Sequence, residues 1–537
     1  SNNAAVGRNS LLANTTGSQN TAIGKSSLAS NTTASNNTAL GYVALNVNTT
    51  GTQNVALGAL ALDANTTANN NTAVGYATLS ANTTGALNTA LGGDTLKNNT
   101  TGQSNTGLGQ NALVANTTAS FNTAVGASAL SANTTGASNV AVGQATLDAN
   151  TTGGSNTGIG QAALGANTTG NDNVAVGNGA LDANTTASFN TAVGRSALTD
   201  NTTGASNTAV GYGSQANTTT GGSNVSVGTN SLEANTTGQY NVAMGTQALD
   251  AAQTADYNTG IGFTAGRLLT TGEKNTFIGG LTADKITVGS NNVVLGYGAL
   301  FSDTQGSRTV AIGSSALTNQ NFTSATNTYN TAVGHSAGNA VTTGTENTFI
   351  GGLAGDATTT GIRNVSVGYT ALGDNTEGNS NVAIGRSALG SNTTADDNVA
   401  VGREALFANT TGEDNVAIGN FALDANTTAS NNTAVGKSAL GANTTASFNT
   451  AIGSLAADAL TAGDSNTAIG YAALSSDTLG ERAIAIGEGA LLTQNFTSET
   501  NNYNVAIGYN AGYAVTTGVN NTIIGGLAGD AATTAEA

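Results

Sequence analysis

The chain has 537 residues, carries a formal net charge of −17, and contains no proline, cysteine or tryptophan. The absence of cysteine excludes disulfides and thiolate metal sites. The 13 Lys and Arg residues are scattered along the chain, which excludes the clustered basic surface of a nucleic-acid-binding protein. No apolar run approaches the ~18 residues of a membrane span.

The dominant feature of the chain is a glycine that recurs with a period of seventeen residues. It first occurs as Gly7 and recurs in steps of 17 to Gly313; after one step of 21 it continues to Gly487, and a second step of 21 leads to the last two markers. A fixed period of this kind predicts a solenoid, in which each unit buries its apolar face only against its neighbours. We interpret residues 1–313 as a regular coil array and residues 314–537 as its continuation with two 21-residue coils. Together they form one repeat domain, which we expect to be a segment of a longer protein.

Every unit has the same order of residue types, numbered here as repeat positions 1 to 17 from an asparagine. In the typical unit Asn122–Ser138, Asn-Thr-Ala-Val-Gly occupies positions 1–5, Ala-Leu positions 8–9 and Asn-Thr-Thr-Gly positions 12–15. The alternation around position 3 predicts a short strand, and glycines at positions 5 and 15 are expected to form the corners. The sequence therefore predicts an all-β fold, a parallel β-solenoid (β-roll) of about 31 coils. Positions 4 and 9, which are Val125 and Leu130 in this unit, are predicted to be buried.

Position 12 is also expected to face the interior. Where position 9 lacks its usual Leu, an apolar residue often replaces the Asn of position 12, although Gly355 with Thr358 is an exception. Such compensation is expected if the two positions share one interior volume. Buried amides need partners, so the Asn residues from Asn14 to Asn201 are predicted to form a stacked ladder. The compensating pairs are Gly266 with Leu269, Ala283 with Ile286, Gly338 with Val341, Ala457 with Leu460, and Gly512 with Val515.

One coil offers only two or three large apolar side chains, too few to offset the entropy lost when the coil is ordered. Either long-range stacking supplies cooperativity, or several chains share an interior. Rows of Ala at positions 3 and 8 would allow neighbouring chains to approach closely. We therefore predict a homo-oligomer of parallel, in-register chains.

The two 21-residue coils belong to a longer repeat with an offset of 174 residues. Asn321-Phe322-Thr323-Ser324 in the first coil returns in the second as the segment that contains Phe496. We single out Phe322 and Phe496 as candidate contact residues at the tips of protruding loops. The alternative is that these insertions are silent loops, which solenoids tolerate.

No arrangement of residues predicts catalysis, a bound metal or a cofactor, and we expect the protein not to be an enzyme. His335 is the only histidine and occupies a variable position. Glu233 and Asp250 share position 10 of adjacent units, which favours a solvated acidic face. The Gly-Gly-Leu-Ala-Gly-Asp stretches are similar to a calcium-binding nonapeptide but occur singly, so calcium is disfavoured.

Three further patterns also have structural explanations. The Asn-Thr-Thr segments match the glycosylation acceptor, but their fixed phase indicates a structural role. Adjacent Thr residues at positions 13 and 14 point to opposite faces, which leaves one Thr rank where an ice-binding plane needs two. Aromatic residues at position 17 either cover the corner of a coil or stack on sugars. They are Phe121, Phe189, Tyr240, Tyr257 and Phe448.

The Asn-Thr-Ala-Val-Gly unit resembles the repeat of trimeric autotransporter adhesin heads. The longer pattern, with Ala-Leu and Asn-Thr-Thr-Gly in phase, resembles still more closely the arrays of bacterial and phage proteins described as tail-fibre-like. The resemblance covers essentially residues 1–537 and implies a β-roll displayed outside the cell, three chains to a rod. We therefore expect a structural fibre or adhesin segment on a cell-surface appendage or phage tail fibre. The alternative is a glycan-binding solenoid that uses exposed aromatics and the loops of Phe322 and Phe496 to hold surface glycans of a target cell.

Overall fold

The structure is a computed structural model that describes residues 2–533; Ser1 and residues 534–537 of the predicted array lie outside the described residues. The chain is a parallel β-solenoid of about 31 turns, with one three-residue strand in each turn. The predicted fold class is confirmed. The chain divides into two compact units, residues 1–271 and 272–537, which are described separately.

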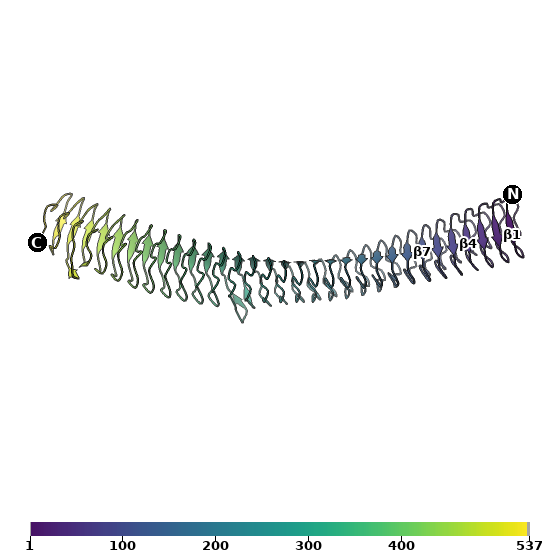
Figure 1. The fold of residues 1–537 in the computed structure, drawn as a ribbon, viewed down its shortest axis with the longest axis horizontal. Coiled ribbons are helices and arrows are strands. Elements are labelled where there is room, and N and C mark those ends of the chain that lie inside the picture. Colours follow the sequence, from purple (N-terminus) through teal and green to yellow (C-terminus); the bar gives the residue numbers. More distant parts are fainter. Residues whose placement is uncertain (1, 534–537) are drawn as a thin grey trace. The chain divides into compact units, whose positions relative to one another are not determined.

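In the first unit, each strand pairs in parallel with the strand one turn later, so that Ala124 lies beside Ala141. The strands lie side by side along one face of the stacked turns (Figure 1). They are β1 (Ala4–Val6), β2 (Thr21–Ile23), β3 (Thr38–Leu40), β4 (Val55–Leu57), β5 (Thr72–Val74), β6 (Thr89–Leu91), β7 (Thr106–Leu108), β8 (Thr123–Val125), β9 (Val140–Val142), β10 (Thr157–Ile159), β11 (Val174–Val176), β12 (Thr191–Val193), β13 (Thr208–Val210), β14 (Val225–Val227), β15 (Val242–Met244) and β16 (Thr259–Ile261).

The second unit repeats this arrangement and adds two short strand pairs within the longer coils. Its main strands are β17 (Thr276–Ile278), β18 (Val293–Leu295), β20 (Val310–Ile312), β22 (Thr331–Val333), β23 (Thr348–Ile350), β24 (Val365–Val367), β25 (Val382–Ile384), β26 (Val399–Val401), β27 (Val416–Ile418), β28 (Thr433–Val435), β29 (Thr450–Ile452), β30 (Thr467–Ile469), β32 (Ile484–Ile486), β34 (Val505–Ile507) and β35 (Thr522–Ile524). The short pairs are β19 (Gly306–Ser307) with β21 (Thr326–Asn327), and β31 (Gly480–Glu481) with β33 (Thr500–Asn501).

The side chains at position 4 point outward, whereas the sequence predicted that they point into the interior. In β8, Ala124 is fully buried, whereas Thr123 and Val125 on either side of it are only partly covered. Position 3 therefore faces inward and positions 2 and 4 face outward, because successive side chains of a strand point to opposite faces. The prediction that position 4 is buried is wrong, and the prediction for position 9 is confirmed, since Leu130 is completely buried. The Ala rows of positions 3 and 8, such as Ala124 and Ala129, are also inside and cannot form the contact between chains.

The turns use left-handed backbone conformations at positions 7, 9 and 17. In the typical unit, Ser128, Leu130 and Ser138 have φ angles of 58°, 51° and 61°. Each such non-glycine residue costs about 1–2 kcal/mol, which bonds between turns offset; the Leu130 N–H, for instance, donates to the Thr146 carbonyl at 3.0 Å. Position 5 has a stricter requirement. Gly126 has a φ of 136°, and a Cβ there would lie 2.3 Å from the carbonyl oxygen of the glycine one turn later.

The predicted amide ladder at position 12 is confirmed. From Asn31 to Asn201, each Nδ2 donates to Oδ1 of the asparagine one turn earlier, as Asn116 does to Asn99 at 2.7 Å. Asn31 to Asn184 are buried and bonded on both sides, so their amides are satisfied without water. The ladder ends at Asn201, whose Oδ1 has no donor because Thr218 occupies position 12 of the next turn.

A second ladder, which the sequence did not predict, follows position 1. Asn122 Oδ1 accepts from the backbone N–H of Asn139 at 2.9 Å, and Asn122 Nδ2 donates to the carbonyl of Gly136 at 3.0 Å. That carbonyl also accepts from Nδ2 of Asn133 at 3.0 Å, so the two ladders meet at position 15. The interior of each turn is therefore held by amides as well as by Leu and Ala.

A large residue at position 3 also compensates for a missing Leu at position 9. Val341, which compensates for Gly338, is completely buried. Phe349 at position 3 is buried as well, and Cβ atoms added at Gly338 and Gly355 would lie 2.7 and 2.3 Å from its ring. One phenyl ring thus fills the volume of two missing Leu side chains. This explains why Gly355 has no apolar partner at position 12.

Candidate functional surfaces

The outer face of the strands is uncharged in every turn and apolar at position 4. Position 4 holds Val, Ile, Leu or Met in all 31 units, and position 2 holds only Thr, Val, Ile or Ala. The position 4 side chains are about half covered: Ile159 is 41% exposed, Met244 40% and Ile384 39%. We call positions 2 and 4 together the sheet face. A soluble monomer rarely exposes a continuous apolar patch of this extent. The sheet face of each of the two compact units is therefore a candidate contact surface.

Most of the acidic residues lie away from the sheet face. Of the 30 acidic residues, 21 occupy positions 10, 16 and 17. Position 6, which follows the sheet face, holds Lys, Arg, Tyr or Phe in 14 of the 31 units. Arg195 lies over the ring of Tyr212, with 6.0 Å between the guanidinium carbon and the ring centroid. Arg and Tyr are enriched at protein interfaces. In those turns the sheet face has an amphipathic border.

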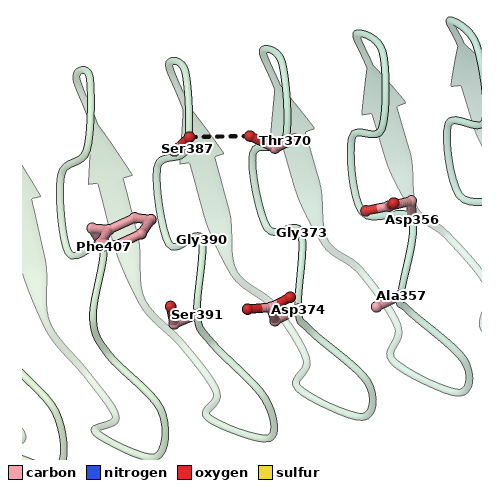
Figure 2. Close-up of a pocket in the computed structure, with 9 residues that line it drawn as sticks. All are labelled: Asp356, Ala357, Thr370, Gly373, Asp374, Ser387, Gly390, Ser391 and Phe407. Atoms are coloured by element: carbon pink, nitrogen blue, oxygen red, sulfur yellow. Dashed lines mark hydrogen bonds between the residues drawn. The ribbon is translucent and has the colours of Figure 1, made fainter.

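A shallow trough crosses four turns of the second unit, on a surface formed by positions 7, 10 and 11 (Figure 2). Its volume is about 330 Å³. Gly373 and Gly390 form its floor, Phe407 closes one end and Asp356 the other. These four residues all occupy position 10 of successive units, and nowhere else in the chain does glycine occupy this position twice in succession. The paired glycines were the sequence signal for this trough, and the sequence interpretation missed it.

The trough is rich in hydrogen-bond acceptors. Thr370 and Ser387 share a hydrogen bond between their hydroxyl oxygens at 3.0 Å along one side, and Asp374 lies on the other side. Burial raises the pKa of Asp356 above its ordinary value, a bond from its own backbone N–H lowers it, and the charge of Asp374 raises it further. No Lys, Arg or His is among the residues that line the trough. It can accept hydrogen bonds from a neutral or cationic ligand, and it disfavours an anion.

The inserted loops are exposed at residues 323–325 and 497–499, but their phenylalanine side chains are buried. Phe322 and Phe496 are only 7% and 5% exposed. The expectation of a phenyl ring at each loop tip is therefore wrong, and contact through the loops themselves stays a prediction.

A buried carboxylate anchors each inserted loop. Asp303 replaces asparagine at position 12, where its Oδ1 accepts from the N–H groups of Gly306 at 3.0 Å and Phe322 at 3.1 Å, and its Oδ2 accepts from Gln320 Nε2 at 2.7 Å. Asp477 makes the same contacts with Gly480, Phe496 and Gln494. Burial raises the pKa of both carboxyls.

The other residues considered in the sequence are exposed or half-buried, and they do not converge on one site. The rings of Tyr240 and Tyr257 stack with 4.8 Å between centroids, at 49% and 54% exposure, so they remain open to solvent. His335 is exposed. Asp250 has its pKa raised by burial and by the charge of Glu233 and lowered by Arg267 in the next turn. That arginine is a basic neighbour that the sequence interpretation overlooked.

Comparisons with protein-family models and with curated protein sequences return no match for this chain. Among residues 2–533, no three His, Cys, Asp or Glu side chains come together in a way that would hold a metal ion. The same part of the chain contains no helix long and apolar enough to cross a membrane.

Proposed function

We propose that this chain is a structural, non-enzymatic segment of an extracellular fibre, in which parallel copies pack through their sheet faces. The observation that carries the proposal is the uncharged apolar sheet face, which is repeated in every turn of a chain with a net charge of −17. A homo-oligomer buries these faces against one another and leaves the acidic positions in solvent. The location, on a cell-surface appendage or phage tail fibre, and a count of three chains are supported by the resemblance to adhesin heads and tail-fibre-like arrays.

The size of the sheet face favours association. Complete burial of a Val, Leu or Ile side chain is worth about 1.5–3 kcal/mol, so burial of the exposed two-fifths of one position 4 side chain contributes about 1 kcal/mol per turn. Repeated over 31 turns, this contribution exceeds the ~4–15 kcal/mol lost when two molecules associate. A surface of this kind does not need a strong contact in any single turn.

The inserted coils would fix the register of such an assembly. A sheet face with a strict 17-residue period allows chains to slip by whole turns. The two 21-residue coils interrupt that period 174 residues apart, and only one parallel register aligns both of them. This gives the insertions a role that does not require their loops to bind a ligand.

The test is the oligomeric state in solution, measured by sedimentation equilibrium. The wild-type chain is expected to be an oligomer at micromolar concentration. Three glutamates on alternate strands of the sheet face should weaken association strongly, since each buried charge costs several kcal/mol. The substitutions are Val142→Glu, Val176→Glu and Val210→Glu.

A matched control places the same charges in the same three turns at position 14, where the Thr side chains are exposed. This control should remain an oligomer. A wild-type chain that stays monomeric, or a sheet-face variant that associates as well as the control, would contradict the proposal. The control substitutions are Thr152→Glu, Thr186→Glu and Thr220→Glu.

A further inference from the structure

We propose that the trough between Asp356 and Phe407 binds one uncharged sugar residue, a function that goes beyond the structural role proposed above. The trough is a local departure from the repeat, because two consecutive glycines at position 10 remove the side chains that otherwise continue this row. A Cβ at Gly373 would meet no atom closer than 3.3 Å, so the chain does not need glycine there for packing. The space above Gly373 is therefore open for a ligand.

The aromatic end of the trough is held in place by the second glycine. A Cβ at Gly390 would lie 2.8 Å from Cε2 and 2.9 Å from Cδ2 of Phe407, so any larger residue would displace the ring. The ring consequently extends over Gly390 towards Gly373 (Figure 2). It is 42% exposed and offers an apolar surface to the C–H groups of a sugar ring.

The polar groups of the trough match the hydroxyl groups of a sugar. Asp356 and Asp374 supply carboxylate acceptors, and Thr370, Ser387 and Ser391 supply hydroxyls that both donate and accept. A hydrogen bond to a charged acceptor is stronger than one between neutral groups. The two carboxylates and the absence of a basic residue from the lining exclude acidic sugars, since a second anion would be repelled.

The trough remains accessible in the proposed fibre. Its lining residues occupy positions 7, 10 and 11, and none belongs to the sheet face at positions 2 and 4. A fibre that associates through the sheet face therefore leaves the trough open. The two proposals can fail independently of each other.

The ligand probes are methyl α-glucoside, methyl β-galactoside and N-acetylglucosamine, with glucuronic acid and N-acetylneuraminic acid as charged comparators. Binding to the full chain is measured by saturation-transfer NMR and titration. A single hexose in an open trough is expected to bind with a Kd of about 1 mM, from the usual contribution per ligand atom. At least one neutral sugar should bind, and the acidic sugars should bind at least about tenfold more weakly.

Two variants and one matched control locate the site. Gly373→Leu fills the trough with a residue that already occurs at position 10 as Leu492, and Phe407→Ala removes the aromatic end. Each should abolish binding or weaken it at least about tenfold. Gly441→Leu introduces the same side chain at the same position of another turn, where a Cβ meets equally distant atoms, 3.3 Å away at the nearest, and it should bind sugar as wild type does.

The proposal is overturned if none of the neutral sugars binds, if Gly373→Leu binds like Gly441→Leu, or if the acidic sugars bind as well as the neutral ones. Gly373→Leu and Phe407→Ala change different parts of the trough. Unfolding of one variant therefore does not explain a loss of binding in both. Sedimentation of the same samples reports separately on fibre assembly.

Discussion

Replacement of one asparagine of the position 12 ladder by aspartate tests how the interior is stabilised. Asn116 is completely buried; its Nδ2 donates to Asn99 Oδ1 at 2.7 Å and to the Ala119 carbonyl at 3.1 Å, and its Oδ1 accepts from Asn133 at 3.0 Å. In Asn116→Asp, an ionised carboxylate would face Asn99 Oδ1 with no donor between them. The folded chain avoids this arrangement by keeping the new carboxyl protonated, since the protonated group can still donate one hydrogen bond.

The magnitude follows from that protonation. A carboxyl whose ordinary pKa is near 4 must be held neutral at pH 7, which costs about 1.36 kcal/mol per pH unit, or about 4 kcal/mol in all. The folded-state pKa is raised, so stability is retained at low pH and is lost as the pH rises through that pKa. Asn116→Ala leaves Asn99 Oδ1 without its donor and should cost about 1–3 kcal/mol at every pH.

Hydrogen exchange followed by mass spectrometry measures the effect turn by turn, because local opening in a repeat protein reports local stability. Peptides that cover turns beside Asn116 should exchange about 1000-fold faster at pH 7 in Asn116→Asp, after correction for intrinsic rates, and most of the protection should return near pH 4. Thr118→Ala, which alters an exposed side chain two residues away, should change little. Wild-type protection in Asn116→Asp at pH 7, or a loss that does not depend on pH, would refute the ladder reasoning.

Three further predictions concern the corner glycines, the compensating phenyl ring and the inserted coils. Gly126→Ala should destabilise its turn by more than about 2 kcal/mol, seen as faster local exchange, because the new Cβ meets a carbonyl of the next turn. Phe349→Ala should cost about 3–5 kcal/mol locally through the cavity it leaves, whereas Phe121→Ala, at 64% exposure, should leave exchange protection unchanged. The raised pKa of Asp303 and Asp477 means that their turns lose stability as the pH rises from about 4 towards 7, so protection there should fall over this range in the wild type and vary less in the double Asp→Asn variant. Protection that rises with pH in these turns would contradict the last prediction.

The 17-residue period was sufficient to predict the fold. It did not predict which side chains of each strand face the interior. Glycine at position 5, Leu at position 9 and Asn at position 12 each recur in phase. They form the corner of the turn, its buried apolar side chain and the amide ladder, respectively. The strand residues at positions 2 to 4 were ambiguous, because alternation states that neighbours face opposite sides without stating which side is inside. A branched residue such as Val125 was placed inside on hydrophobicity alone, whereas the interior takes Ala124.

The signal that resolves this ambiguity was present in the exceptions. A large residue appears at position 3 where neighbouring turns lose Leu, as with Phe349, and a small one appears where the preceding turn gains bulk. A Cβ at Gly107 would lie 2.6 Å from the Thr95 side chain of the turn before it. Size compensation across turns therefore identifies position 3 as interior. The trough could be inferred only in outline, since consecutive glycines do not reveal that the Phe407 ring turns over one of them.

The outward orientation of position 4 raises the question of why this position is always apolar. The interior of a turn is already filled by Leu, Ala and two amide ladders, and when it needs more volume the chain supplies it at position 3. Position 4 contributes nothing to that interior, yet it is apolar in every one of the 31 units, while the variable positions accept charge freely. Exposed β-branched residues support a strand only modestly, and Thr at both outer positions would serve the strand as well without an apolar surface. A covered sheet face accounts for this restriction, and for that reason the charge substitutions at Val142, Val176 and Val210 are the decisive test of the fibre proposal.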